Sequence, residues 1–180
     1  MFERVSGLLE PWAGALGADL QCYRNHALRV LNLCDRLAEF LPFAEAPPPS
    51  DRTEFVAAAV FHDLGIWSAG TFDYLHPSVQ LARSWLTEHG RGDLVPVVSQ
   101  MIEQHHKLTP AADPQSPVEM FRRADTIDVL LGARRFGVAW SDYRAILRSY
   151  PDLGFHLRLL VLTAQRARTH PLSPLPMFKW

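Results

Sequence analysis

Several histidines and aspartates occupy positions that helical periodicity turns toward the interior of the protein. His26 falls in an apolar stripe with Val30 and Leu33, and His62 continues a stripe with Phe55 and Ala58. The same spacing turns three further ionisable side chains inward, namely Asp63, His105 and Asp125. A buried ionised carboxylate costs several kcal/mol unless it is paired or bound to a cation. The carboxylates among these residues therefore need a positively charged partner in the interior, and the inward-facing histidines would share it.

Imidazole and carboxylate groups from four separate segments are the donors that divalent cations bind. The alternative is a buried hydrogen-bonded network of histidines and aspartates without a metal. A divalent cation explains the pattern better, because it satisfies the carboxylates and selects neutral imidazole. We therefore expect one or two divalent transition-metal ions, and this donor set does not distinguish Fe, Mn, Co, Ni and Zn.

Helices must position these groups, since helical periodicity dominates the chain and strand alternation is not apparent. The expected class is all-α, a single bundle of about seven to eight helices over residues 1–180, with a core motif region at about 22–131. C-terminal helices and a proline-rich tail follow over 141–180. Proline, glycine and capping signals predict helices at 2–17, 19–41, 52–65, 77–89, 93–106 and 118–136, and two more that start near 141 and 151.

Composition narrows the possible partners and compartments. The net charge of −1 produces no field that would attract nucleic acid or an anionic membrane, so we expect a small-molecule substrate, no nucleic-acid polymer and no membrane. The sequence has no run of 18 apolar residues and no signal-peptide start, which makes the cytoplasm the expected location. Cys22 and Cys34 lie about 18 Å apart along one predicted helix, too far for a disulfide, and are expected to be reduced. The oligomeric state is left open.

The order of the inward-facing residues resembles that of the HD superfamily. His26 lies in segment 24–30, segment 61–65 reads Phe-His-Asp-Leu-Gly, and segment 124–128 reads Ala-Asp-Thr-Ile-Asp. The resemblance extends from about residue 22 to residue 131. It implies a helical domain in which one metal ion is held by His26, His62, Asp63 and Asp125.

Two further positions resemble the ligands of family members that bind two metals. His76 precedes Pro77 at the start of a predicted helix, and the segment 102–106 reads Ile-Glu-Gln-His-His, as in the HD-GYP phosphodiesterase branch. The resemblance implies that His76 and His105 hold a second metal, with Asp63 bridging both ions. His106 is a possible additional ligand. The alternative for His76 is a solvent-exposed residue in the first turn.

The chain also departs from the HD-GYP pattern. Ile66 stands where that branch usually has a lysine, and no Gly-Tyr-Pro motif follows the paired histidines. Hydrolysis of cyclic dinucleotides is therefore disfavoured. Other dinuclear members are di-iron oxygenases, and the superfamily also includes a hydratase, so these reactions on a small molecule remain the alternative. A non-catalytic module that binds a ligand or partner is a third possibility.

The favoured interpretation is a metal-dependent hydrolase, most simply a phosphohydrolase that acts on a small phosphate ester or nucleotide through a metal-bound hydroxide. Asp63 would bridge the metals, and Arg29 and Lys107 would receive the phosphoryl oxygens. Arg122 is a weaker candidate for that role. The alternative for each cation is a solvated surface charge. Tyr74 is a candidate for the wall of a small pocket, whereas His89 and His156 are expected to lie outside the site.

Overall fold

The computed structural model describes residues 1–40 and 47–169, and the regular secondary structure of these residues is entirely helical. The α-helices are α1 (Phe2–Leu9), α2 (Ala13–Leu16), α3 (Leu20–Ala38), α4 (Thr53–Phe61), α5 (Gly65–Ser68), α6 (Leu75–Glu88), α7 (Val95–Gln104), α8 (Pro117–Val129), α9 (Trp140–Ser149) and α10 (Phe155–Thr169). Eight of them have at least eight residues, which confirms the predicted all-α class. The predicted tail after residue 169 lies outside the described residues.

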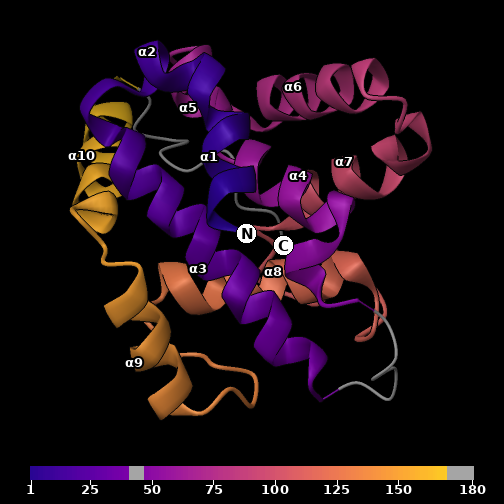
Figure 1. The fold of residues 1–180 in the computed structure, drawn as a ribbon. Helices are drawn as coiled ribbons and strands as arrows, with labels where there is room; N and C mark the ends of the chain where they lie inside the picture. The colour runs from indigo at the N-terminus through magenta and orange to yellow at the C-terminus, as the bar shows by residue number, and fades with distance from the viewer. Residues whose placement is uncertain (41–46, 170–180) are drawn as a thin grey trace.

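Helices α3 and α4 form the centre of the bundle. Helix α3 crosses the molecule between α10 and α4 and packs against α1, α4 and α8 (Figure 1). Every residue of α4 from Phe55 to Phe61 is buried, because α3, α6 and α7 surround it. A helix that is apolar on all sides is stable only in such an enclosed position. The end of α4 therefore lies in the interior, where a polar side chain has no access to bulk water.

Several helix boundaries differ from those predicted. The first predicted helix is interrupted by a 3-10 turn at Glu10–Trp12, where Pro11 lacks the amide that a continuous helix requires. The sixth ends at Val129 rather than at residue 136, because Leu131 and Gly132 adopt positive φ angles of 51° and 76°. The Gly132 amide donates to the Ile127 carbonyl at 2.8 Å, which closes the end of α8.

The other differences are smaller. The third predicted helix ends at Phe61 instead of residue 65, and a 3-10 turn at Gly92–Leu94 precedes α7. Helix α6 begins at Leu75, two residues before the predicted start, and α10 begins at Phe155 rather than near residue 151. Residue 41, the predicted end of the second helix, lies outside the described ranges. Cys22 and Cys34 are buried free thiols, as expected. None of the helices in the described ranges is long and apolar enough to cross a membrane.

Candidate metal centre

Five of the side chains that the sequence analysis singled out meet at one buried place. His26 comes from α3, His62 and Asp63 follow the last turn of α4, His105 follows α7, and Asp125 lies on α8. Each of the five residues is at most 2% exposed. Together with His106 they form three overlapping groups of possible metal ligands: His26, His62 and Asp125; His62, Asp63 and His105; and His105, His106 and Asp125.

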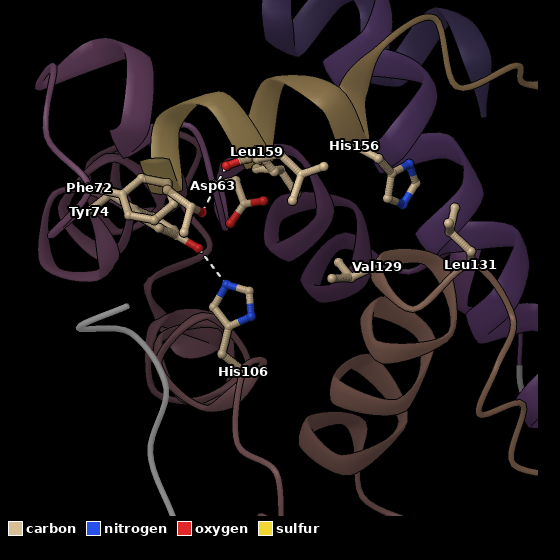
Figure 2. A pocket seen from close by; sticks show the side chains of 10 residues that line it. Asp63, Phe72, Tyr74, His106, Val129, Leu131, His156 and Leu159 are labelled. Carbon is tan, nitrogen blue, oxygen red and sulfur yellow. Dashed lines mark hydrogen bonds between the residues drawn. The ribbon is translucent and has the colours of Figure 1, made fainter. Parts of the chain in front are cut away.

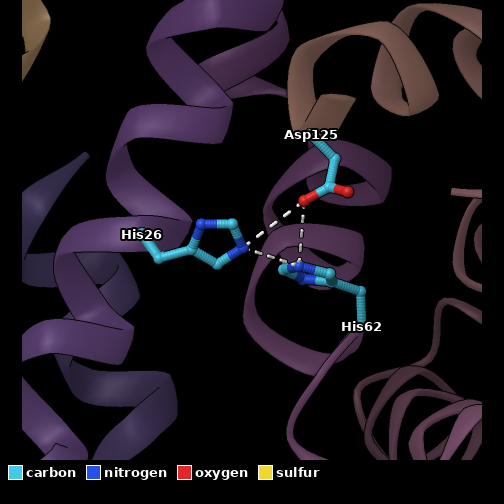
Figure 3. Close-up of side chains that lie close together, drawn as sticks. All are labelled: His26, His62 and Asp125. Atoms are coloured by element: carbon cyan, nitrogen blue, oxygen red, sulfur yellow. Dashed lines mark hydrogen bonds and ion pairs between the residues drawn. The ribbon is translucent and has the colours of Figure 1, made fainter. Parts of the chain in front are cut away.

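Two imidazoles and a carboxylate converge in the first of these groups (Figure 3). The Nε2 atoms of His26 and His62 lie 3.0 Å apart. Asp125 Oδ1 lies 3.5 Å from the first of them and 3.7 Å from the second. Three potential donor atoms from three helical segments thus face a common point.

The other nitrogen of each imidazole already has a partner that can only accept a hydrogen bond. His26 Nδ1 donates to Asp128 Oδ2 at 2.7 Å, His62 Nδ1 donates to the Ala59 carbonyl at 3.0 Å, and His105 Nδ1 donates to the Ile102 carbonyl at 2.6 Å. In the neutral rings these bonds place the proton on Nδ1 and leave a lone pair on Nε2. The three Nε2 atoms and the carboxylates of Asp63 and Asp125 are then all acceptors.

A cluster composed only of acceptors is unfavourable unless a proton or a cation lies among them. Asp63 Oδ1, Asp125 Oδ1 and His105 Nε2 are buried and have no hydrogen-bond partner among the described residues. An unsatisfied buried polar atom costs about 1–3 kcal/mol, and more when it is charged. These atoms and the shared orientation of the lone pairs fit a divalent cation bound by imidazole nitrogens and carboxylate oxygens.

The two carboxylates each extend across the cluster. Asp63 Oδ2 lies 3.4 Å from His62 Nε2, whereas Asp63 Oδ1 lies 3.3 Å from His105 Nε2. Asp125 faces His26 and His62 with Oδ1, and its Oδ2 lies 4.0 Å from His106 Nδ1. Each carboxylate therefore has one oxygen toward His26 and His62 and the other toward the His105–His106 pair.

Burial and neighbouring charges shift the pKa values of the closely packed imidazoles and carboxylates in the cluster. Burial alone would lower the pKa of His62, but the negative charges of Asp63 and Asp125 raise it to about 9. Burial opposes ionisation of the two aspartates, but His62 and its neighbouring histidines lower the pKa of both carboxyl groups. Burial and the nearby His105 lower the pKa of His106 to about 3. The carboxylates are therefore ionised at neutral pH, and a cation that binds here would displace the proton from His62 Nε2.

A second layer of residues fixes the orientation of His26. Asp128 accepts from its Nδ1, and Arg29 donates to both oxygens of the same carboxylate, from Nε at 2.7 Å and from Nη2 at 2.8 Å. Arg29 also donates from Nη1 to the Tyr150 carbonyl at 3.1 Å. The ring of Phe155 stacks on the His26 ring, with centroids 4.0 Å apart and planes inclined by 14°. The imidazole is thus held from its edge and from one face.

Local structure around Asp63 explains the glycine that follows it. The chain turns sharply from α4 into α5, and the Gly65 amide donates to Ser78 Oγ at 3.0 Å. A Cβ atom on Gly65 would lie 2.5 Å from the Tyr74 carbonyl oxygen and 2.8 Å from Ser78 Oγ. Only glycine permits this close approach of α6 to the turn. The position of this turn between α4 and α5 directs the Asp63 side chain into the cluster.

The structure does not bring every predicted residue to this centre. His76 is exposed in the first turn of α6 and belongs to none of the three ligand groups found among the described residues. Arg29 is fully buried and bound to Asp128 and to backbone carbonyls, so its position supports a positioning role instead of the predicted contact with phosphoryl oxygens. Lys107 is half-buried in the wall of a small cavity beside His106 and Asp125.

Three contributors to the site were missed or undervalued by the sequence analysis. Asp128 shares the inward face of α8 with Asp125, and the three-residue spacing was the signal that could have identified it. Phe155 and His156 follow Gly154 in the region where a helix was predicted to start near residue 151, and the sequence contains no local signal that places Phe155 against His26. His156, expected to lie outside the site, donates from Nε2 to the Asp128 carbonyl at 2.9 Å and lines a cavity next to Asp63.

Comparison with known families agrees with this geometry. The model of the HD domain matches residues 23–130, more than half of the chain. The chain therefore belongs to the HD domain family, which is part of a superfamily of metal-dependent phosphohydrolases. No curated protein and no solved structure matches the chain.

Proposed function

We propose that this protein is a metal-dependent phosphohydrolase that releases phosphate from a small phosphate ester in the cytoplasm. The observation that carries the proposal is the buried cluster of acceptors, in which three imidazole Nε2 atoms face the carboxylates of Asp63 and Asp125. His26 and His62 lie on one side of the two carboxylates, and the His105–His106 pair lies on the other. This arrangement favours two divalent cations over one. A cation in such a site supplies Lewis acidity and an activated water molecule.

A small basic cavity next to the cluster supports a phosphorylated substrate. The cavity has a volume of about 70 Å³. Its wall combines three residues of the cluster with three cationic side chains, namely His105, His106 and Asp125 with Lys107, Arg122 and Arg134. Arg122 is engaged by Glu119, from Nη2 to Oε1 at 2.7 Å. Lys107 and Arg134 are therefore the better candidates to attract phosphoryl oxygens.

The protein's own residues would perform three tasks in this reaction. His26, His62 and His105 present Nε2 lone pairs in fixed directions, because each Nδ1 is hydrogen-bonded. Asp63 and Asp125 neutralise positive charge and accept protons or hydrogen bonds at their unpaired oxygens. Lys107 and Arg134 favour the charge that develops on the phosphoryl oxygens in the transition state. The buried walls exclude competing bulk water.

Metal analysis combined with an activity assay tests the proposal. The protein is purified anaerobically, its metal content is measured, and phosphate release from a set of phosphate monoesters is followed with and without O₂. We expect metal-dependent release of phosphate that does not require O₂. Asp63→Asn should lose both bound metal and activity, whereas His89→Ala, a change at an exposed histidine outside the cluster, should retain both.

Other outcomes would contradict the proposal in distinguishable ways. Two bound irons with O₂ uptake and no phosphate release would identify the oxygenase chemistry that the donor set also permits. Addition of water to a small unsaturated substrate without phosphate release would identify a hydratase. Full metal content in Asp63→Asn would show that the ligands have been assigned wrongly.

A further inference from the structure

A larger cavity opens beside the metal centre, on the side of Asp63 and His106. It has a volume of about 350 Å³, within the range of pockets that hold small organic molecules. Its walls come from the segments that follow α4 and α7, from the segment before α6, from the end of α8 and from α10: Asp63, Phe72, Tyr74, His106, Val129, Leu131, His156, Leu159, Leu160 and Thr163. Figure 2 shows Phe72 and Tyr74 on one side of this space and Val129 and Leu131 on the other, with Asp63 between them.

The walls of this cavity are apolar except where they meet the metal centre. Aromatic and aliphatic side chains make up most of the lining, and no lysine or arginine is among the described residues that form it. The remaining polar groups have partners within the protein. Thr163 Oγ1 donates to the Leu159 carbonyl at 2.8 Å, His156 bonds the Asp128 carbonyl, and the Tyr74 hydroxyl lies 2.5 Å from His106 Nε2.

Such walls do not suit a nucleotide. A ribose and a base present many hydrogen-bonding groups, each of which loses its hydration on entering a pocket and must be compensated. The polar groups of this cavity outside the metal centre are already hydrogen-bonded within the protein, so they cannot replace the hydrogen bonds that a nucleotide loses with its hydration. The transfer of an alkyl or aryl group from water into the cavity is favourable by itself. The cavity therefore favours a hydrocarbon occupant.

The large cavity and the small basic cavity adjoin each other at the metal centre. Both are lined by His106 and Val129, and between them they expose Asp63 and Asp125, the two carboxylates of the cluster. A molecule with an apolar body and a phosphate head would place each end in a matching environment. Its ester bond would then lie beside His106, at the junction of the two cavities.

We propose that the substrate is a phosphate monoester of an apolar alkyl or aryl alcohol, bound with its hydrocarbon body in the large cavity. This inference rests on the proposed function and specifies the substrate class for the same site. The reaction breaks the bond between phosphorus and the ester oxygen and forms a bond between phosphorus and the oxygen of water. A proton from that water passes to the departing alkoxide, so that alcohol and inorganic phosphate are released.

A homologous series of substrates gives a quantitative test. Phosphate release by the metal-loaded protein is measured with n-alkyl phosphates from ethyl to hexyl, and with AMP and glycerol phosphate for comparison. Burial of each added methylene favours binding by a factor of roughly three to four. We expect kcat/KM to rise by about that factor per methylene until the cavity is filled, and hexyl phosphate to exceed AMP.

Two leucines on the same helix provide the variant and its matched control. Leu160 lines the cavity and is 67% exposed, whereas Leu157 is 65% exposed and does not line it. Because neither side chain is in the core, both variants should fold, which circular dichroism checks. Leu160→Asp should flatten the dependence on chain length, and Leu157→Asp should leave it unchanged.

A binding measurement separates this inference from the proposed function. Fluorescence titration with 1-naphthol reports occupation of the cavity without catalysis, and Leu160→Asp should weaken binding by at least tenfold relative to Leu157→Asp. Phosphate release without a dependence on chain length, or with AMP preferred, would overturn the substrate class but leave the phosphohydrolase. No phosphate release from any ester would overturn the proposed function, and naphthol binding would then still support the apolar site. Absence of naphthol binding would overturn the apolar site.

Discussion

His26 and Asp128 are joined by a 2.7 Å hydrogen bond that links the middle of α3 to the end of α8. The bond sets the tautomer of the imidazole and so decides that Nε2, rather than Nδ1, faces the metal centre. Arg29 binds the same carboxylate through two nitrogens, which keeps Asp128 ionised in a fully buried position. Burial alone would raise the pKa of Asp128, but the hydrogen bond from His26 and the charge of Arg29 lower it.

Replacing Asp128 by asparagine should weaken the metal centre without removing a ligand. The amide lacks the negative charge that orients His26, and loss of such an outer partner typically lowers metal affinity by about 10–100-fold. The change also leaves Arg29 without its buried counter-charge, so we expect the free energy of unfolding to fall by about 3–5 kcal/mol. Isothermal titration with Mn²⁺ and urea denaturation measure the two effects. Asp93→Asn, at an exposed position, is the control, and equal behaviour of the two variants would refute the positioning role.

The second set of ligands can be assigned by comparing two histidine variants. His106 belongs to a ligand group with His105 and Asp125, whereas His76 is exposed on α6. We therefore expect His106→Ala to lose affinity for one of two metal equivalents by about tenfold or more. His76→Ala should keep both equivalents, as measured by metal analysis after dialysis. Should His76→Ala alone lose an equivalent, the ligand set implied by the family resemblance is the correct one.

Acid should destabilise the protein partly through Glu119. Burial alone would raise the pKa of this carboxyl group, but hydrogen bonds from Arg122, the Ala111 amide and Arg123 lower it to about 2. Because the folded pKa lies below the usual value of 4.5, this group contributes stability above pH 4.5 and loses it as the pH falls toward 2.

The corresponding measurement compares Glu119→Gln with the wild type in urea at several pH values. At pH 7 we expect the free energy of unfolding of the variant to be about 3 kcal/mol lower than that of the wild type, because Arg122 loses its buried partner. The difference should shrink between pH 4.5 and 2. Glu103→Gln, at an exposed position on α7, should show no such difference, and a gap that stays constant with pH would exclude the ion pair as its cause.

Gly65→Ala should disturb both stability and metal binding. The added methyl group would lie 2.5 Å from the Tyr74 carbonyl oxygen, and overpacking of this kind costs about 1–3 kcal/mol. Movement of the turn would also displace Asp63, so metal affinity should fall. Gly7→Ala on α1 has no atom within 4 Å of the new methyl group and should leave stability unchanged or slightly higher. Thermal unfolding of the two variants with and without Mn²⁺ is the measurement, and similar effects would contradict the steric argument.

The sequence by itself determined the fold class and the convergence of most of the candidate ligands. Helical periodicity is a local property, so the inward orientation of His26, His62 and Asp125 could be predicted from the residues three and four positions away. The buried aspartates added an energetic argument, because an ionised carboxylate in the interior requires a partner. Helix ends were less accurate, as at α8, which ends where Leu131 adopts a positive φ and where Trp140 and Tyr143 pack closely against Gly132.

Only the tertiary structure decided which charged side chains serve the site and which stabilise it. The sequence does not distinguish the roles of Arg29 and Lys107. In the folded protein Arg29 is enclosed beside Asp128, whereas Lys107 lies in the wall of a cavity. The apolar cavity was also beyond prediction, because its walls come from segments as distant as Phe72, Val129 and Leu159. Such contacts depend on the relative placement of whole helices, which no local periodicity specifies.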